Sequence, residues 1–265
     1  MPIFKCPDFS IGNELTKEQL DFFDKNGIIL FRNFLKKETV ADIIREINSI
    51  DNEWLKEGRT KVNGILLKFG IDEYGNKIIQ RSGFLSLFSP LLHELLQDPR
   101  LQALLPMLHP YEGRIGENEK DGLVLNHYIR VPNGTFSKMG WHTDCPRDLF
   151  LGQRIMPMLN VGIHLDDCLY ENGGLRVLVG THKQNMFGLM FGKRYYTNNP
   201  DKNEAGFNIA SGDLTVHDGR IWHRVQQSPY YGEKSRRRVL YIPIITGKYM
   251  PKSEKSRVAF YHYFR

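Results

Sequence analysis

The sequence is poor in cysteine, with only Cys6, Cys145 and Cys168 among 265 residues. The number is odd, and no two of them have the Cys-x-x-Cys spacing of a zinc or redox motif. Disulfide frameworks use even sets of cysteines and belong to oxidising compartments. The cysteine content therefore argues against disulfides and against a cysteine-based zinc site, and it predicts a reducing, cytoplasmic environment.

Long apolar runs are missing as well. No stretch reaches the roughly 18 apolar residues that a membrane-spanning helix needs. After Met1 to Cys6 the chain turns polar, and the apolar region of a secretory signal is missing, so no signal peptide is expected. With 41% hydrophobic and 25% charged residues, the composition is that of a globular protein with no membrane span.

Most of the chain carries almost no net charge. The formal net charge is +6, but residues 232–265 hold nine Lys or Arg and two acids, so the excess lies at the C-terminal end. No recognition helix, zinc finger or RNA-binding motif accompanies it, which argues against a nucleic-acid partner. Two interpretations stay open: a solvated basic face, or one arginine of Arg236–Arg238 that binds a carboxylate or phosphate.

The C-terminal segment, residues 248–265, combines basic and aromatic residues. Val258 to Phe264 reads Val-Ala-Phe-Tyr-His-Tyr-Phe, directly after the basic stretch. Exposed aromatic side chains favour burial, so a free tail of this composition is not expected. We predict that this part docks on its own chain or on a neighbouring subunit, and the second option would give a homo-oligomer.

Helix signals dominate the first 120 residues. Thr16 and Gln19 have the spacing of a capping box, and Asn26-Gly27 ends the helix that they begin. A short apolar strand at 28–31 and a second helix at about 37–47 follow. The pattern also predicts a hairpin over 61–82 that turns at 73–76, and helices at 90–96 and 101–108.

After about residue 120 the pattern changes to short β-type runs between Gly, Pro and Asn turns. Strands at this density are typical of a β-sandwich or barrel. No linker or repeat divides the chain, so we predict one domain over 1–265. It has a mostly helical part at 1–120, a β core at 121–247 and the C-terminal segment. The predicted strands are 123–130, 159–166, 175–179, 213–217 and 239–245.

One short segment, Gly140-Trp141-His142-Thr143-Asp144, carries residue types that bind metals. Side chains at i and i+2 of a strand point to one face, so His142 and Asp144 could bind the same ion. A distant histidine, His223, would complete a set of two imidazoles and one carboxylate. That set leaves three positions open on Fe(II).

Two rivals compete with this set. His164 and Asp166 have the same spacing on another predicted strand, and His217 lies six residues before His223. With nine histidines and 30 acidic residues, a chance His-x-Asp match is expected. Spacing alone therefore leaves the choice of ligands open.

Five segments follow one another in a recognisable order. They are Leu15-Thr16…Phe22-Phe23…Asn26-Gly27-Ile28, Trp141-His142-Thr143-Asp144, Leu165-Asp166-Asp167…Glu171-Asn172-Gly173-Gly174-Leu175…Gly180-Thr181-His182, Gly212-Asp213-Leu214…Trp222-His223 and Arg236-Arg237-Arg238-Val239-Leu240. In this order they resemble the phytanoyl-CoA dioxygenase family of Fe(II)/2-oxoglutarate oxygenases, from about Leu15 to Pro243.

The resemblance implies a fold and a ligand set. The fold is a double-stranded β-helix, or jelly roll, that is mainly β with N-terminal helices packed on one sheet. The implied metal ligands and catalytic residues are His142, Asp144 and His223. Asp166 falls in a structural turn of the family pattern, which favours Asp144 as the carboxylate ligand.

The resemblance also implies a site for 2-oxoglutarate. Arginine suits its 5-carboxylate, because the planar guanidinium pairs with carboxylates in bidentate fashion and keeps its charge. The family spacing picks Arg237, with Arg236 and Arg238 as alternatives one residue away. Polar residues that alternate along predicted strands would line the same interior. The predicted cofactor-binding residues are Arg237, Asn126, Tyr128, Asn160 and Tyr241.

The implied reaction is hydroxylation of an unactivated C–H bond in a small-molecule or acyl substrate. It would use Fe(II), 2-oxoglutarate and O₂, and it would release succinate and CO₂. A carboxylate at Asp144 favours oxygenation over halogenation, while desaturation, epoxidation and ring formation stay open. Two alternatives are a non-catalytic jelly-roll binding protein and a cupin-type metalloenzyme that does not use 2-oxoglutarate. Only the oxygenase should release succinate.

Overall fold

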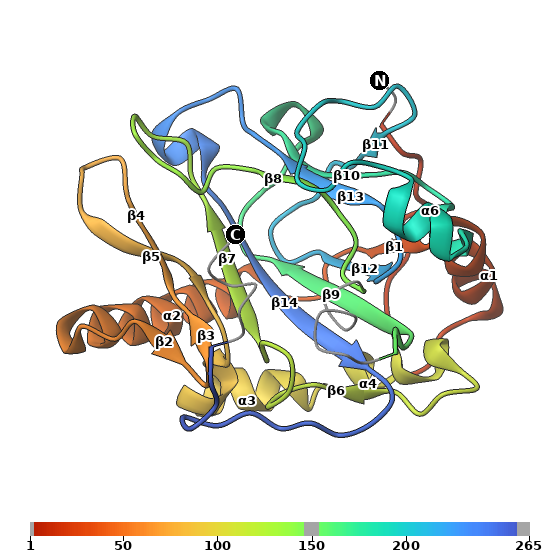
Figure 1. Ribbon diagram of the computed structural model, residues 1–265, viewed down its shortest axis with the longest axis horizontal. Coiled ribbons are helices and arrows are strands. Elements are labelled where there is room, and N and C mark those ends of the chain that lie inside the picture. The colour runs from red at the N-terminus through yellow and green to blue at the C-terminus, as the bar shows by residue number, and fades with distance from the viewer. Residues whose placement is uncertain (1–2, 146–153, 259–265) are drawn as a thin grey trace.

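The computed structural model describes residues 3–145 and 154–258 (Figure 1). Within these ranges, two antiparallel sheets form the β core. The large sheet runs in the order β1 (Ile28–Phe31), β12 (Leu214–Asp218), β9 (Met158–His164), β14 (Arg237–Ile245), β7 (Val124–Tyr128), β5 (Lys77–Ser82) and β4 (Lys68–Ile71), with β6 (Arg114–Ile115) beside β14. The small sheet runs β11 (Ala205–Gly206), β10 (Gly174–Val177), β13 (His223–Gln226) and β8 (Met139–His142).

The helices of the N-terminal part lie beside the large sheet, with α2 and α3 together at the lower left of Figure 1. The described helices are α1 (Lys17–Asn26), α2 (Lys37–Glu57), α3 (Pro90–Leu96), α4 (Pro99–Gln102) and α6 (Met186–Phe191). No helix among the described residues is both long and apolar enough to cross a membrane.

The predicted capping box at the start of α1 is confirmed. The Thr16 hydroxyl accepts the Gln19 backbone N–H at 3.2 Å, and the Gln19 side chain accepts the Thr16 N–H at 2.9 Å. At the other end, Gly27 adopts a left-handed conformation with φ of 74°, which glycine reaches without steric cost. The local sequence thus sets both ends of this helix.

Two helix predictions were wrong. The second helix does not stop near residue 47 but continues to Glu57, because Ile50 and Trp54 extend the buried apolar face of α2 by two more turns. The predicted helix 101–108 is broken instead into α4 and a 3₁₀ turn at Leu105–Leu108. Pro106 lies in that turn and has no N–H for a continuing α-helix.

The predicted strands are all present, with ends within two residues of the expected positions. The hairpin over 61–82 is confirmed as the pair β4 and β5. A smaller hairpin, β2 (Lys61–Val62) and β3 (Ile65–Leu66), precedes it and was not separated from it in the prediction. Asn63 and Gly64 connect these strands with φ of 47° and 79°, the positive values that an Asn-Gly hairpin turn requires.

The large sheet has two different faces, because alternate residues of a strand point to opposite sides. The helix-side face packs in one apolar cluster with Ile43 and Ile47 of α2, and it consists of Leu125, Val161, Ile163, Leu214, Val216, Leu240 and Ile242. The interior face points toward the small sheet. Its polar residues are Asn126, Tyr128, Asn160, His164, Thr215, His217, Arg237 and Tyr241.

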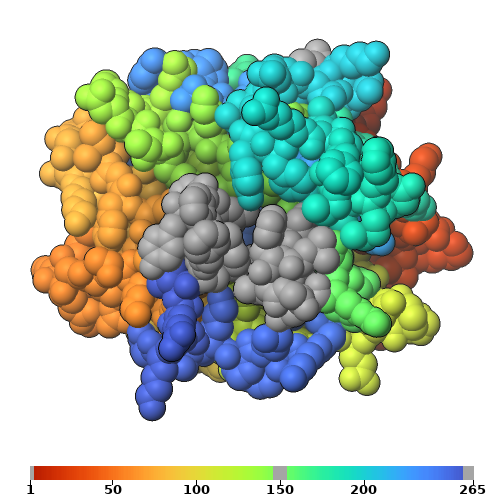
Figure 2. Space-filling model, in the orientation of Figure 1, coloured from red at the N-terminus to blue at the C-terminus, as the bar shows by residue number. Residues whose placement is uncertain are grey.

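The outer side of the small sheet is covered by the chain between β10 and β12, which occupies the upper right of Figure 2. Trp141 is buried there and donates its indole N–H to the Asn199 carbonyl at 2.9 Å. A buried ion pair between Arg224 and Glu204, with 2.6 Å between Nη2 and Oε1, lies on the same side. This side is therefore closed, and the interior lies between the two sheets.

The described part of the C-terminal segment lies against the body of the protein. Arg114 donates to the carbonyls of Gly247 and Lys248 at 2.9 and 3.1 Å, and Glu119 accepts the Met250 N–H at 2.6 Å. Of the aromatic part that we predict to dock, only Val258 is among the described residues. Docking of that part, and the homo-oligomer it would allow, stay predictions.

Candidate functional site

Three side chains converge between the two sheets. One ligand atom each from His142, Asp144 and His223 lies within 4.8 Å of the other two. His142 ends β8 and His223 begins β13, where the two residues are direct partners with ring centroids 4.1 Å apart. One detail of the prediction was wrong: β8 ends at His142, so Asp144 lies beyond the strand.

Hydrogen bonds set the tautomers of both histidines. The Nδ1 atom of His142 is 2.8 Å from the Gly140 carbonyl, and that of His223 is 3.1 Å from the Ile221 carbonyl. A carbonyl oxygen only accepts, so each Nδ1 carries the proton and donates it. Each Nε2 therefore presents a lone pair, as a metal-binding imidazole must.

The pKa shifts of Asp144 and His223 agree with metal binding. Burial alone would raise the pKa of Asp144, but the interaction with His223 and the hydrogen bond from His217 outweigh it and hold this pKa well below its usual range. Burial, together with His142, lowers the pKa of His223 well below 6.5, although Asp144 opposes the shift. At neutral pH the site thus offers a carboxylate and a neutral imidazole, the forms that bind metals.

The rival pair does not converge. The Asp166 carboxylate accepts from Arg238 Nε and Nη2 at 2.8 and 2.7 Å. The His164 ring is on the interior face, with Nε2 3.1 Å from the Thr215 hydroxyl. The other rival, His217, lies 3.3 Å from the Asp144 carboxylate through Nε2. Among the described residues, the only cluster of this kind with metal-binding geometry is His142, Asp144 and His223.

The three consecutive arginines have different surroundings. Arg236 pairs with Glu73, and Arg238 pairs with Asp166. Arg237 is 2% exposed and donates to the carbonyls of Gln226 and Ser137 at 2.8 and 3.2 Å. Its Nε has no hydrogen-bond partner, and no carboxylate pairs with it, within the described ranges. Of the three, Arg237 alone is a buried cation without a counter-charge in the part of the chain that the structure describes.

The other predicted cofactor-binding residues lie on the same interior face. Burial, with Tyr128 and Asp144 nearby, raises the pKa of Tyr241 well above 10, so its phenol stays protonated. Asn126 has a buried Oδ1 without a partner among the described residues. Tyr128 stacks on Phe136 with ring centroids 4.7 Å apart. Asn160 instead donates to Asp144 Oδ2 at 3.1 Å, which the sequence did not indicate.

Sequence reasoning also missed the residues that surround the Arg237 guanidinium. A Cβ on Gly173 would lie 2.9 Å from Arg237 Nη1, and one on Gly174 would lie 2.1 Å from Cys168 Sγ. Both glycines have positive φ, at 86° and 82°. The tandem glycines therefore let the turn before β10 approach the arginine closely, and a Gly-Gly pair at a strand start is a readable signal for such an approach.

Comparison with known proteins places the chain in a family. The family model for phytanoyl-CoA dioxygenase matches residues 23–229, which include all three converging residues. The chain belongs to the phytanoyl-CoA dioxygenase family. This confirms the resemblance that the five sequence segments indicated.

Curated relatives of this family member include the ectoine dioxygenases of Bordetella parapertussis and Bordetella bronchiseptica. Each is 23% identical over 179 residues, a match that covers 65% of this chain and 51% of the relative. The chain thus spans about half the length of the curated relatives it matches.

Solved structures show the same fold as this phytanoyl-CoA dioxygenase family chain. HygX from Streptomyces hygroscopicus, crystallised with nickel and 2-oxoglutarate, aligns with a TM-score of 0.62 and 16% identity over 89% of each chain. The carbocyclase SnoK from nogalamycin biosynthesis aligns with a TM-score of 0.64 and 16% identity over 95% of this chain and 90% of SnoK. The predicted double-stranded β-helix is therefore confirmed.

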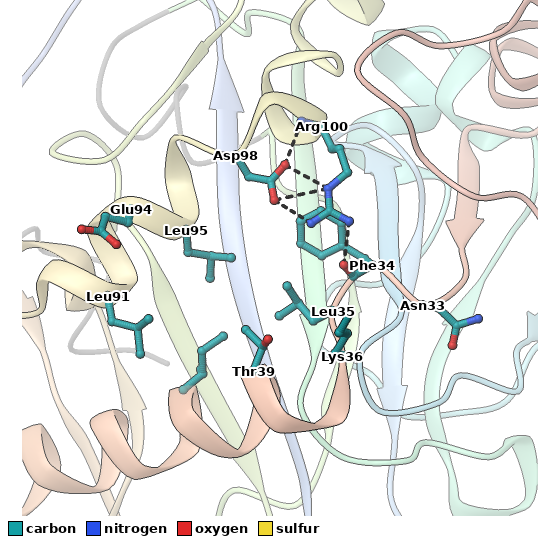
Figure 3. A pocket seen from close by; sticks show the side chains of 11 residues that line it. Asn33, Phe34, Leu35, Lys36, Thr39, Leu91, Glu94, Leu95, Asp98 and Arg100 are labelled. Carbon is teal, nitrogen blue, oxygen red and sulfur yellow. Dashed lines mark hydrogen bonds and ion pairs between the residues drawn. The ribbon is translucent and has the colours of Figure 1, made fainter.

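A hollow of this family member lies on the helix side, between the start of α2 and helices α3 and α4 (Figure 3). It measures about 470 Å³, and Leu35, Ile43 and Leu95 are among its lining residues. Its Arg100 donates to the Asp98 carboxylate and to the Phe34 carbonyl, at 2.6 and 2.8 Å. This arginine thus already has a counter-charge, unlike Arg237 in the interior.

Proposed function

We propose that this family member is an Fe(II)- and 2-oxoglutarate-dependent dioxygenase that hydroxylates an unactivated C–H bond of a small-molecule or acyl substrate. In the balanced reaction, substrate, O₂ and 2-oxoglutarate give the alcohol, succinate and CO₂. One oxygen atom enters the product and the other enters succinate. The observation that carries the proposal is the convergence of two imidazoles and a carboxylate on the same interior that holds an arginine without a counter-charge among the described residues.

The residues present fit the metal. His142 and His223 would bind it through Nε2, and Asp144 would bind it through a carboxylate oxygen. Fe(II), when bound, supplies the redox chemistry that oxidises 2-oxoglutarate and activates O₂. Two histidines and one carboxylate suit this role because they leave coordination positions free for other groups.

The residues also fit the cosubstrate. A buried charge is costly unless it is paired, and the 5-carboxylate of 2-oxoglutarate would pair with Arg237. The carbonyls of Gln226 and Ser137 hold the guanidinium in place, so little freedom would be lost on binding. The protonated phenol of Tyr241 would donate to a bound oxygen atom, and Asn126 Oδ1, an acceptor, would pair with a donor such as a substrate hydroxyl or a water.

A substrate screen tests the proposal. The purified protein, Fe(II) and 2-oxoglutarate are incubated with small-molecule and acyl candidates, and succinate and product mass are measured. We expect one class of candidates to raise succinate release and to gain 16 mass units, the mass of one oxygen atom. The His142→Ala protein is the control for succinate from other sources. Metal binding without 2-oxoglutarate binding would instead support the cupin-type alternative, and binding of neither would support a non-catalytic protein.

A further inference from the structure

Asp144 is held differently from the two histidines. His142 and His223 belong to paired strands, and a backbone carbonyl orients each ring. Asp144 lies beyond the end of β8, and its backbone N–H donates to the Gly219 carbonyl at 2.8 Å. Strand pairing therefore does not orient its carboxylate.

The large sheet orients this carboxylate from the opposite side of the interior. Asp144 Oδ2 accepts from Asn160 Nδ2 at 3.1 Å and is 3.3 Å from His217 Nε2. Asn160 in β9 and His217 in β12 are direct partners in the sheet, so the two donors stand side by side. Both hydrogen bonds fall on one oxygen, Oδ2, which also lies 3.9 Å from His223 Nε2.

The contact also defines the role of His217. A carboxylate only accepts, so the proton must lie on His217 Nε2. An imidazole nitrogen that carries a proton has no lone pair for a metal. The ring is 1% exposed, its centroid is 4.5 Å from that of His223, and its Nδ1 has no hydrogen-bond partner among the described residues. His217 thus lies next to the metal site, but its geometry is that of a hydrogen-bond donor to Asp144 and not that of a metal ligand.

We propose that His217 and Asn160 are positioning residues that hold the Asp144 carboxylate and thereby fix its orientation toward the metal. The inference rests on the proposed metal site. Partners of this kind fix the direction of a ligand, and losing one typically weakens metal affinity by about 10- to 100-fold. We expect an effect of this size for each donor, and less than the product of the two in the double variant, because both donors act on one oxygen.

The test compares substitutions at two interior histidines. His217→Phe keeps a ring and removes the donor, while His217→Gln restores an N–H near the same place. His164→Phe is the matched control, because it removes a histidine from the same face that hydrogen-bonds Thr215 and not Asp144. Asn160→Leu removes the second donor and serves if His217→Phe does not fold. The readouts are the Co(II) dissociation constant of the apo-protein, the visible absorption of bound Co(II), and the apo-protein melting temperature.

We expect His217→Phe and Asn160→Leu to weaken Co(II) binding by about 10- to 100-fold, with His217→Gln recovering most of the loss. The control His164→Phe should stay close to the unmodified protein. If His217→Phe lowers only the melting temperature, the residue is structural and the proposal fails. If both His217 variants lose Co(II) altogether, His217 is a ligand and the proposal also fails. Absence of Co(II) binding in the unmodified protein would instead overturn the proposed function itself.

Discussion

The two faces of the large sheet are built from the same strands but differ in role: one packs in the apolar core, and the other carries the candidate site. On the helix-side face, Val161, Ile163 and Leu240 are essentially fully buried in an apolar cluster. On the interior face, the neighbours Asn126 and Arg237 are also buried but keep polar atoms that have no partner among the described residues. The helix-side face therefore contributes most of the stability. The polar atoms without partners mark the interior face as the place where a ligand would bind.

The same contrast separates two arginines of the molecule. The arginine of the helix-side hollow, Arg100, is paired with Asp98, and its guanidinium also stacks 4.2 Å from the Phe34 ring. The interior arginine, Arg237, donates to two backbone carbonyls and pairs with no carboxylate among the described residues. A charged group that is satisfied within the protein stabilises the fold, whereas one that is left without a counter-charge is ready for an anion.

The largest expected effect is a loss of metal binding on the interior face with the helix-side face left intact. His142→Ala removes one of three ligands, and we expect the iron content of the purified protein to fall from near one per chain to near zero. The fold should persist, because the helix-side cluster is untouched. Asp166→Ala is the control, since that carboxylate pairs with Arg238 and not with the site. Iron content and circular dichroism measured on both variants check this, and full occupancy in His142→Ala would refute the ligand assignment.

The converse change lowers stability at the helix-side face and leaves the metal site intact. Ile163→Ala leaves a cavity in the apolar cluster, and we expect it to lower the free energy of unfolding by about 2–5 kcal/mol. Ile163 lies between the interior residues Gly162 and His164 in β9, so its backbone serves both faces. Urea unfolding measures the loss, and metal stoichiometry should be unchanged. A loss of metal without a loss of stability would show that the faces are not separable in this way.

The pH dependence of stability should differ in sign between the two sides. Burial raises the pKa of Asp51, in α2, from 3.8 to about 7, and it lowers the pKa of His164, on the interior face, from 6.5 to about 4. Between pH 4.5 and 6, Asp51 keeps a proton that the unfolded chain loses, so its contribution falls as pH rises. His164 lacks a proton that the unfolded chain binds, so its contribution falls as pH drops. Each slope approaches about 1.4 kcal/mol per pH unit.

Single variants separate these opposed slopes. In Asp51→Asn, the free energy of unfolding should increase more steeply with pH than in the unmodified protein. In His164→Asn, it should decrease with pH relative to the unmodified protein. Urea unfolding of the apo-proteins at several values between pH 4.5 and 6 measures both. Parallel curves for all three proteins would show that neither group titrates as burial implies.

The sequence predicted the fold where local pattern and long-range packing agree. Apolar periodicity and capping residues located α1 and the strands, and family resemblance selected His142, Asp144 and His223. The family spacing also picked Arg237, with Arg236 and Arg238 left open as alternatives. The length of α2 was missed because its apolar face was not followed through Trp54.

Other features of the site could not be predicted, because they depend on contacts between sheets. The hydrogen bonds from Asn160 and His217 to Asp144 join β9 and β12 to a bend after β8. No local spacing encodes such a contact, since the two partners are set by how the sheets face each other. The pairing of Arg236 with the hairpin residue Glu73 is of the same kind.

The central claim is that the interior binds 2-oxoglutarate through a metal at one end and Arg237 at the other. The most direct test is anaerobic titration of 2-oxoglutarate into the Fe(II)-loaded protein, followed by the visible absorption band that forms when a 2-oxo acid chelates iron. We expect saturation in the unmodified protein and in Arg236→Ala. Arg237→Ala should lose about 2–5 kcal/mol, at least about 30-fold in affinity. Absence of the band in the unmodified protein, or unchanged affinity in Arg237→Ala, would contradict the account.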